Sequence, residues 1–182
     1  MPIKFHIEAK ELFDDRLNEF RQVKAQDVTL EHSLISISKW ESKWHKPFLS
    51  KDSKTVEEFV DYVRCMTITQ NVDPNVYTAL ITMPKLLSEV SDYIDSSMTA
   101  TTFSKNNGPP NREIITAEII YYWMIFYGIP FECQKWHLSR LLTLINVCNI
   151  KGGSQKKMSG REVMANNRAL NAARRKKLNT RG

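Results

Sequence analysis

The sequence has few cysteines and no long apolar run. Its three cysteines, Cys65, Cys133 and Cys148, are odd in number and widely spaced, which argues against a disulfide framework and favours a reducing compartment. The longest apolar run, Ile119–Tyr127, has nine residues, whereas a membrane-spanning helix needs about 20. The first residues also lack the basic-then-apolar pattern of a secretory signal. We therefore expect neither a membrane span nor secretion.

Signatures of enzymes are missing as well. The KGGS at 151–154 lacks the spacing of a phosphate-binding loop, and no Gly-x-Ser-x-Gly elbow surrounds any serine. Glu118 has no second carboxylate or histidine at a spacing that pairs with it. Cys133 and His137 would share a face of a predicted helix, but with Cys148 as the one other nearby thiol the zinc ligand set is incomplete. We predict no catalytic residues, no cofactor, no metal site and no enzymatic activity.

Positive charge is concentrated at the end of the chain. Residues 151–182 hold ten of the 26 Lys and Arg residues and one of the 20 acidic residues, so they carry +9 while residues 1–150 carry −3. The densest basic cluster is Arg174, Arg175, Lys176 and Lys177. Such a run can bind phosphates, yet no aromatic side chain accompanies it to stack on bases. A solvated arm and a nucleic-acid-binding arm are both open interpretations.

The apolar pattern predicts an α+β fold that is mainly α-helical. Alternation in PIKFHIEA and EFRQVKAQDVTLEHSL indicates a small N-terminal antiparallel sheet. Capping boxes at Thr55–Glu58 and Ser159–Glu162, and the Asp73–Pro74 pair, indicate helix starts. Residues 96–111 resemble a long exposed loop. We expect one globular domain over 1–150, with the sheet in 1–31 and a helical body in 32–150, followed by a linker and a basic helical arm over 151–182.

Two tryptophans fall at helical spacing before Pro47. Trp40 and Trp44, with lysines beside them, fit a buried stripe on a helix whose lysines extend to solvent. The same residues could stack on nucleic-acid bases. The spacing favours the core interpretation.

The aromatic run belongs to a predicted central helical hairpin, with helices over 112–127 and 130–149 joined by Gly-Ile-Pro. The first helix is apolar nearly all round, and a chain of this size covers few helices completely. We therefore expect one face to pack on another subunit or protein, since aromatic residues are enriched at interfaces. The candidate partner-binding residues are Tyr121, Tyr122, Trp123, Phe126 and Tyr127.

Helical spacing divides this run into two faces. Ile119, Trp123 and Phe126 should lie together, with Tyr122 at their edge, while Tyr121 and Ile125 should point away. We expect one of these faces to be buried in the isolated chain and the other to be exposed or covered by a partner.

Four stretches together resemble a family of small proteins encoded by tailed phages, the tail assembly chaperones of long-tailed phages. They are LEHSLISISKWESKWHKPFL, MTATTF, EIIYYWMIFYGIPFECQKWHLSRLLTLINVCNIK and LNAARRKKLNTRG. The likeness covers residues 30–182, and residues 1–29 match least. It implies that the protein binds the tape measure protein during tail assembly, forms a homo-oligomer and has no enzymatic activity. It transfers no established functional residues.

Two alternatives accompany that resemblance. The first is a virion structural protein, such as a head or head–tail connector component. The second is a nucleic-acid-binding protein that uses the basic arm. In each case the expected location is the bacterial host cytoplasm during phage assembly, with incorporation into the virion left open.

Overall fold

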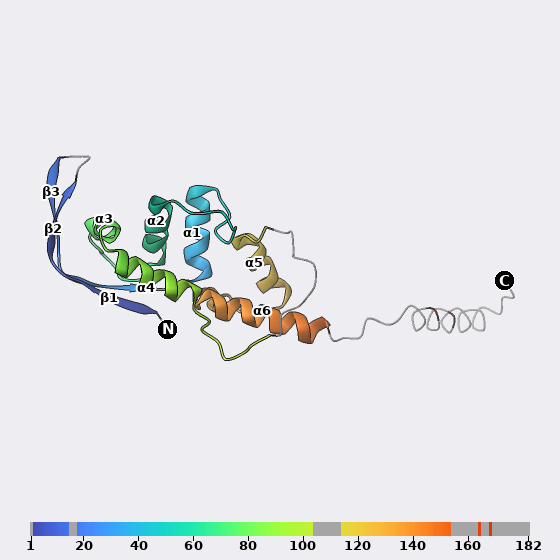
Figure 1. Cartoon of the computed structure of the whole chain (residues 1–182). Coiled ribbons are helices and arrows are strands. Elements are labelled where there is room, and N and C mark those ends of the chain that lie inside the picture. The colour runs from blue at the N-terminus through green and yellow to red at the C-terminus, as the bar shows by residue number, and fades with distance from the viewer. Residues whose placement is uncertain (1, 15–17, 104–113, 154–163, 165–167, 169–182) are drawn as a thin grey trace. The chain divides into compact units, whose positions relative to one another are not determined.

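The computed structural model describes residues 2–14, 18–103, 114–153, 164 and 168 (Figure 1). The fold is α+β and mainly helical, as the sequence predicts, with strands confined to the N-terminal part. The strands are β1 (Ile3–Ile7), β2 (Lys10–Asp14), β3 (Glu19–Val23) and β4 (Gln26–Leu30). The helices are α1 (Leu34–Trp44), α2 (Val56–Met66), α3 (Asn75–Ile81), α4 (Pro84–Asp95), α5 (Ala117–Phe126), the 3-10 helix η1 (Phe131–Lys135) and α6 (Leu138–Gly153).

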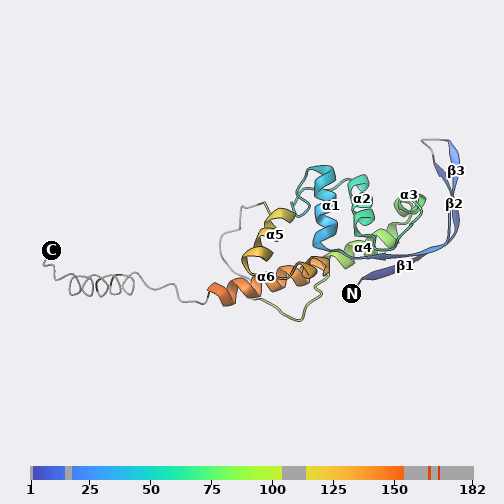
Figure 2. The same ribbon diagram turned by 180° about the vertical axis from the view of Figure 1, so that it is seen from behind.

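The four strands form one long antiparallel ribbon with an interruption. Strand β1 pairs with β4, beginning at Ile3 opposite Leu30, and β2 pairs with β3, beginning at Lys10 opposite Val23. The register is the same on both sides of the break, so the chain runs out and returns as a single hairpin. Figures 1 and 2 show the β2–β3 end reaching away from the helices. The predicted antiparallel pairing is confirmed, with β2 as an unpredicted strand.

Local capping explains where the first two helices begin. Ser33 accepts the Ser36 N–H and Ser36 Oγ accepts the Ser33 N–H, which closes a capping box at the start of α1. The predicted capping box of Thr55 and Glu58 starts α2. Helix α1 ends where His45 takes the left-handed conformation, two residues before Pro47.

Helices α1 and α2 pack on each other and enclose part of the core. Trp40 is 1% exposed, and its Nε1 donates to the Glu58 carbonyl oxygen at 2.9 Å. Trp44 is only half-buried, and its Nε1 donates to Asp61 Oδ2 at 2.9 Å. The expectation of two core tryptophans therefore holds in full for Trp40 and in part for Trp44.

The predicted helix over 130–149 is wrong for residues 130–137. Residues 131–135 form the 3-10 turn η1, Trp136 is extended, and α6 begins at Leu138. The cause is a tertiary contact with the start of α1. His137 forms an isolated antiparallel β-bridge with Ser33, and the Leu138 N–H donates to the His32 carbonyl oxygen at 2.8 Å. That strand-like pairing overrides helical propensity. The preceding helix begins at Ala117 and not at residue 112.

Two compact units make up the chain, Met1–Ile145 and Asn146–Gly182, and the boundary falls within α6. Residues 151–153, expected to open the linker, are the last turn of α6. The basic cluster Arg174, Arg175, Lys176 and Lys177, and the capping box at residues 159–162, lie outside the described residues. Within the described ranges, every helix is too short or too polar to cross a bilayer.

Candidate functional site

Helix α5 is anchored at its start by a carboxylate from α1. Its N-cap residue, Thr116, makes no side-chain cap hydrogen bond. Instead Glu41 Oε2 accepts the Ala117 N–H at 2.7 Å, and Glu41 Oε1 accepts the Phe48 N–H, also at 2.7 Å. Glu41 is 8% exposed. A buried carboxylate at a helix N-terminus satisfies an orphan donor and complements the helix dipole, so α5 is held firmly against α1.

One stripe of α5 is buried and the opposite stripe is open. Ala117, Ile120 and Met124 are fully buried at 3,4 spacing. Tyr122, Ile125 and Phe126 are 61%, 65% and 65% exposed; we refer to these three residues as the α5 face. Large apolar side chains this exposed on one helix are unusual for a surface that meets only water.

The expected division of the run into faces is wrong in its membership. The buried stripe is built by Ile120 and Met124, which belonged to neither predicted group. Ile125 joins Tyr122 and Phe126 on the exposed side. The error arises because helical spacing gives only the angles between side chains around the helix axis. Which side of α5 is buried depends on how Glu41 and the rest of α1 contact the helix.

The five candidate partner-binding residues fall into two environments. Tyr122 and Phe126 are exposed and stack with their ring centroids 6.1 Å apart. Tyr121, Trp123 and Tyr127 are half-buried. The Tyr127 ring meets Phe126 edge-on at 5.0 Å, whereas the Tyr121 hydroxyl donates to Gln134 Oε1 at 2.9 Å. Burial, with the nearby Glu118 carboxylate, raises the pKa of Tyr121.

Further exposed aromatic side chains follow in and after η1. Phe131 is 53% exposed with its ring centroid 6.4 Å from that of Tyr121, and Trp136 is 37% exposed beneath the Arg140 guanidinium at 4.8 Å. Neither was a candidate, since the candidates were restricted to the first predicted helix and both residues lie in the second, which the structure breaks.

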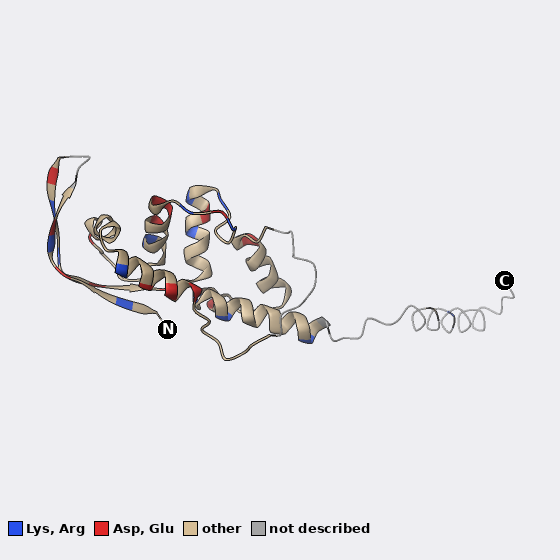
Figure 3. Ribbon diagram, viewed as in Figure 1, with Lys and Arg blue, Asp and Glu red and all other residues tan. Residues whose placement is uncertain are grey.

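Charge is nearly absent from α5. Figure 3 shows the helix without basic residues and with one acidic residue near its start, which is the exposed Glu118. Covering each residue of the α5 face would contribute about 1–2 kcal/mol from apolar burial. The arrangement therefore suits apolar binding of another surface.

A second, buried cluster was missed entirely. His32 and His137 are 4% and 2% exposed, with ring centroids 5.1 Å apart. Burial first, and His137 second, lower the pKa of His32 to about 3. Burial also lowers the pKa of His137, whose Nε2 donates to the Tyr93 carbonyl at 3.2 Å. Both rings are therefore neutral near pH 7. His32 and His137 are 105 positions apart in the sequence, so no pattern among neighbouring residues could predict this contact.

The residues considered as metal ligands do not form a site in the structure. Cys133 and His137 do not share a helix, because the chain is extended at Trp136 between them. Among the described residues, no group of three or more His, Cys, Asp or Glu side chains is placed to hold a metal ion.

Comparisons with protein-family models, curated proteins and solved structures each gave no match for this chain.

Proposed function

We propose that this protein acts in the assembly of a tailed phage by binding other proteins, and that its partner docks on the α5 face. The observation that carries the proposal is the exposure of Tyr122, Ile125 and Phe126 on an ordered, anchored helix. Partner surfaces of this kind centre on a few large aromatic and aliphatic side chains.

The anchoring of α5 supports this assignment. Because Glu41 and the buried stripe of Ile120 and Met124 fix the helix, the exposed side chains are presented without a folding step at the moment of binding. A preorganised surface loses less conformational entropy on association. Half-buried Tyr127 supports the Phe126 ring edge-on, which restrains it further.

The specific role that we propose is that of a tail assembly chaperone engaging the tape measure protein in the host cytoplasm. This narrower assignment rests on the sequence resemblance of residues 30–182. A head or head–tail connector component would use the same surface to contact a different phage protein. In both cases the α5 face also offers a contact between copies of the chain, and we propose a homo-oligomer.

Affinity capture from infected cells tests the proposal. The native chain should retain the tape measure protein, and the triple variant Tyr122→Ser, Ile125→Ser, Phe126→Ser should lose it. A matched control replaces three apolar residues that are exposed elsewhere in the chain, Val56→Ser, Ile68→Ser and Ile81→Ser (56%, 54% and 48% exposed).

The outcomes separate the candidate roles. If the native chain captures a head or connector protein and the triple variant does not, the assignment of the α5 face as the binding surface stands and the chaperone role is overturned. Equal capture by the native chain and both variants would overturn the assignment of the α5 face.

A second candidate function, nucleic-acid binding, is favoured by the +9 charge of residues 151–182. Phosphate neutralisation releases counterions, so affinity for DNA should fall steeply as salt rises. Fluorescence anisotropy with labelled duplex DNA checks this. An absence of binding at low salt would remove the candidate.

A further inference from the structure

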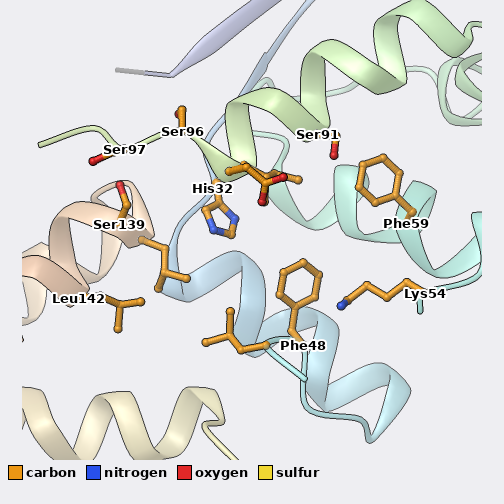
Figure 4. A pocket seen from close by; sticks show the side chains of 13 residues that line it. His32, Phe48, Lys54, Phe59, Ser91, Ser96, Ser97, Ser139 and Leu142 are labelled. Carbon is orange, nitrogen blue, oxygen red and sulfur yellow. The ribbon is translucent and has the colours of Figure 1, made fainter. Parts of the chain in front are cut away.

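A cavity of about 490 Å³ opens beside His32, remote in sequence from the α5 face. It lies between the end of α4, the connection from α1 to α2 and the first turns of α6 (Figure 4). Its apolar wall is formed by Phe48, Leu49, Phe59, Ile94, Leu138 and Leu142. The volume is within the range of small-molecule sites, which combine an apolar lining with a few directed polar groups.

His32 directs an N–H group at this cavity. Tyr62 Oη lies 2.5 Å from His32 Nδ1. The other polar neighbour of Tyr62 Oη is Ser36 Oγ, which is farther away at 3.4 Å. Burial raises the pKa of Tyr62, so its hydroxyl is protonated, and we assign its hydrogen to the shorter of the two contacts, the one with Nδ1. The neutral His32 ring then carries its hydrogen on Nε2.

That Nε2–H group has no hydrogen-bond partner among the described residues. It is also not enclosed, because Gln26 Nε2 is the one fully buried side-chain nitrogen or oxygen without a partner in the described part of the chain. His32 is nevertheless 96% buried, since only 4% of its surface is exposed, and it lines the cavity (Figure 4). A ligand acceptor placed in the cavity would therefore be able to hydrogen-bond this group directly.

Lys54 is the second donor that lines the cavity. Its Nζ lies 4.5 Å from the centroid of the Phe48 ring and forms no ion pair within the described part of the chain. By contrast, Lys43 and Lys46 each contact a carboxylate, on Asp61 and Glu58. Burial is the main effect on Lys54 and lowers its pKa, while the nearby Glu58 and Asp52 carboxylates act in the opposite direction. A carboxylate brought by a ligand would compensate the desolvated ammonium.

The other polar groups of the lining are arranged differently. Ser139 Oγ is already engaged, because it contacts His137 Nδ1 at 2.9 Å and accepts the Met98 N–H at 3.1 Å. Asp95 is the one acidic residue that lines the described cavity, and it is exposed at the end of α4.

We propose that this cavity binds a small carboxylic acid with an apolar body. The carboxylate accepts from His32 Nε2–H and Lys54 Nζ, and the apolar body packs on Phe48, Leu138 and Leu142. This site is independent of the α5 face and of the proposed role in phage assembly.

Titration of the full-length chain with octanoate and with octanamide, its uncharged analogue, tests the proposal by calorimetry at neutral pH. Lys54→Met should weaken octanoate binding about tenfold or more, the effect expected for losing a hydrogen bond to a charged group. Octanamide binding should be unchanged in that variant. The control Lys51→Met removes an exposed lysine of the same connection that does not line the cavity, and it should behave as the native chain.

Two further measurements locate the site. Octanoate should shift the imidazole nitrogen resonances of His32 and leave those of exposed His45 in place. Leu142→Phe, which narrows the apolar wall, should weaken both probes. Equal affinity for octanoate and octanamide in the native chain, equal effects of Lys54→Met and Lys51→Met, or no binding of octanoate would each overturn the proposal.

Discussion

Helices α1 and α5 pack against each other, yet their sequences and their environments are opposite. Helix α1, LISISKWESKW, contains three serines, two lysines and a glutamate, but Leu34, Ile37 and Trp40 are almost fully buried. Helix α5, AEIIYYWMIF, has one charged residue and leaves three large apolar side chains more than half exposed. Burial therefore follows position in the fold more closely than apolar content.

The difference also concerns polar residues. Helix α1 buries Ser36 and Glu41, and both are fully hydrogen-bonded to backbone groups. These contacts fix the neighbouring helix and loop, so the polar residues of α1 contribute to the fold. The surplus apolar residues of α5 contribute little to it. We interpret them as reserved for association.

The largest effect should come from Trp40, at the centre of α1. Trp40→Ala removes a buried indole together with its hydrogen bond to the Glu58 carbonyl, and we expect a loss of about 3–5 kcal/mol in the free energy of unfolding. Chemical denaturation followed by circular dichroism measures it. Trp44→Ala, at the half-buried end of α1, should cost clearly less. Equal losses would contradict the assignment of the core to one side of α1.

The second-largest effect should be a loss of stability at acidic pH, caused by protonation of the buried His32. His32 has a folded pKa of about 3 against its usual 6.5, so the unfolded chain binds the extra proton. Stability is thus full above about pH 6.5 and falls as pH decreases toward the folded value. For His32 alone the loss should be about 2 kcal/mol by pH ~5.

Urea denaturation across this pH range checks the acid effect. His137, whose pKa is also lowered, should add to the loss in the same direction. His45→Asn, which removes an exposed histidine and keeps a residue suited to the left-handed conformation, should leave the acid sensitivity as it is. Stability that is flat between neutral pH and about pH 5 would contradict the buried neutral pair.

Glu41→Gln should have a smaller effect that is confined to the junction between the two helices. The amide has one oxygen, while two backbone N–H groups, of Phe48 and Ala117, need acceptors. One buried donor is left unsatisfied, at a cost of about 1–2 kcal/mol. Amide hydrogen exchange at residues 117–120 should accelerate. Glu118→Gln, in the exposed first turn of α5, is the control and should change stability by less than about 0.5 kcal/mol.

The smallest effect on folding should come from the α5 face. Serine at Tyr122, Ile125 and Phe126 removes surface that is mostly solvent-exposed, so the free energy of unfolding should change by less than about 1 kcal/mol. Sedimentation should show loss of self-association, with an unchanged circular dichroism spectrum. A collapse of stability on the scale of Trp40→Ala would mean that the face is ordinary core.

Local sequence rules predicted much of the fold. The capping box of Thr55 and Glu58, the helix after Pro74 and the antiparallel N-terminal strands depend on contacts within a few residues, which composition and periodicity reveal. The break at Trp136 was not predicted, because it depends on backbone pairing of His137 with Ser33. No window of neighbouring residues contains that information.

The sequence identified the helix with surplus apolar residues, but it did not identify which side of that helix is exposed. The aromatic run showed where surplus apolar surface lies. The exposed side of α5 depends on the contact with Glu41. From the helical pattern, Glu41 was predicted only to belong to α1. Glu41 lies on the apolar side of its helix between Trp40 and Trp44. A charged residue in such a position is a signal that could have indicated a buried polar contact.

Photo-crosslinking in infected cells tests the central claim most directly. A benzoylphenylalanine replaces Phe126 of the α5 face in one sample and Phe20 of β3 in another, because the two phenylalanines are similarly exposed at 65% and 68%. The account predicts a discrete crosslinked product with a phage protein or a second copy of the chain from position 126, and a far weaker one from position 20. No product from position 126, or equal products from both positions, would contradict the claim that α5 keeps its apolar face for a partner.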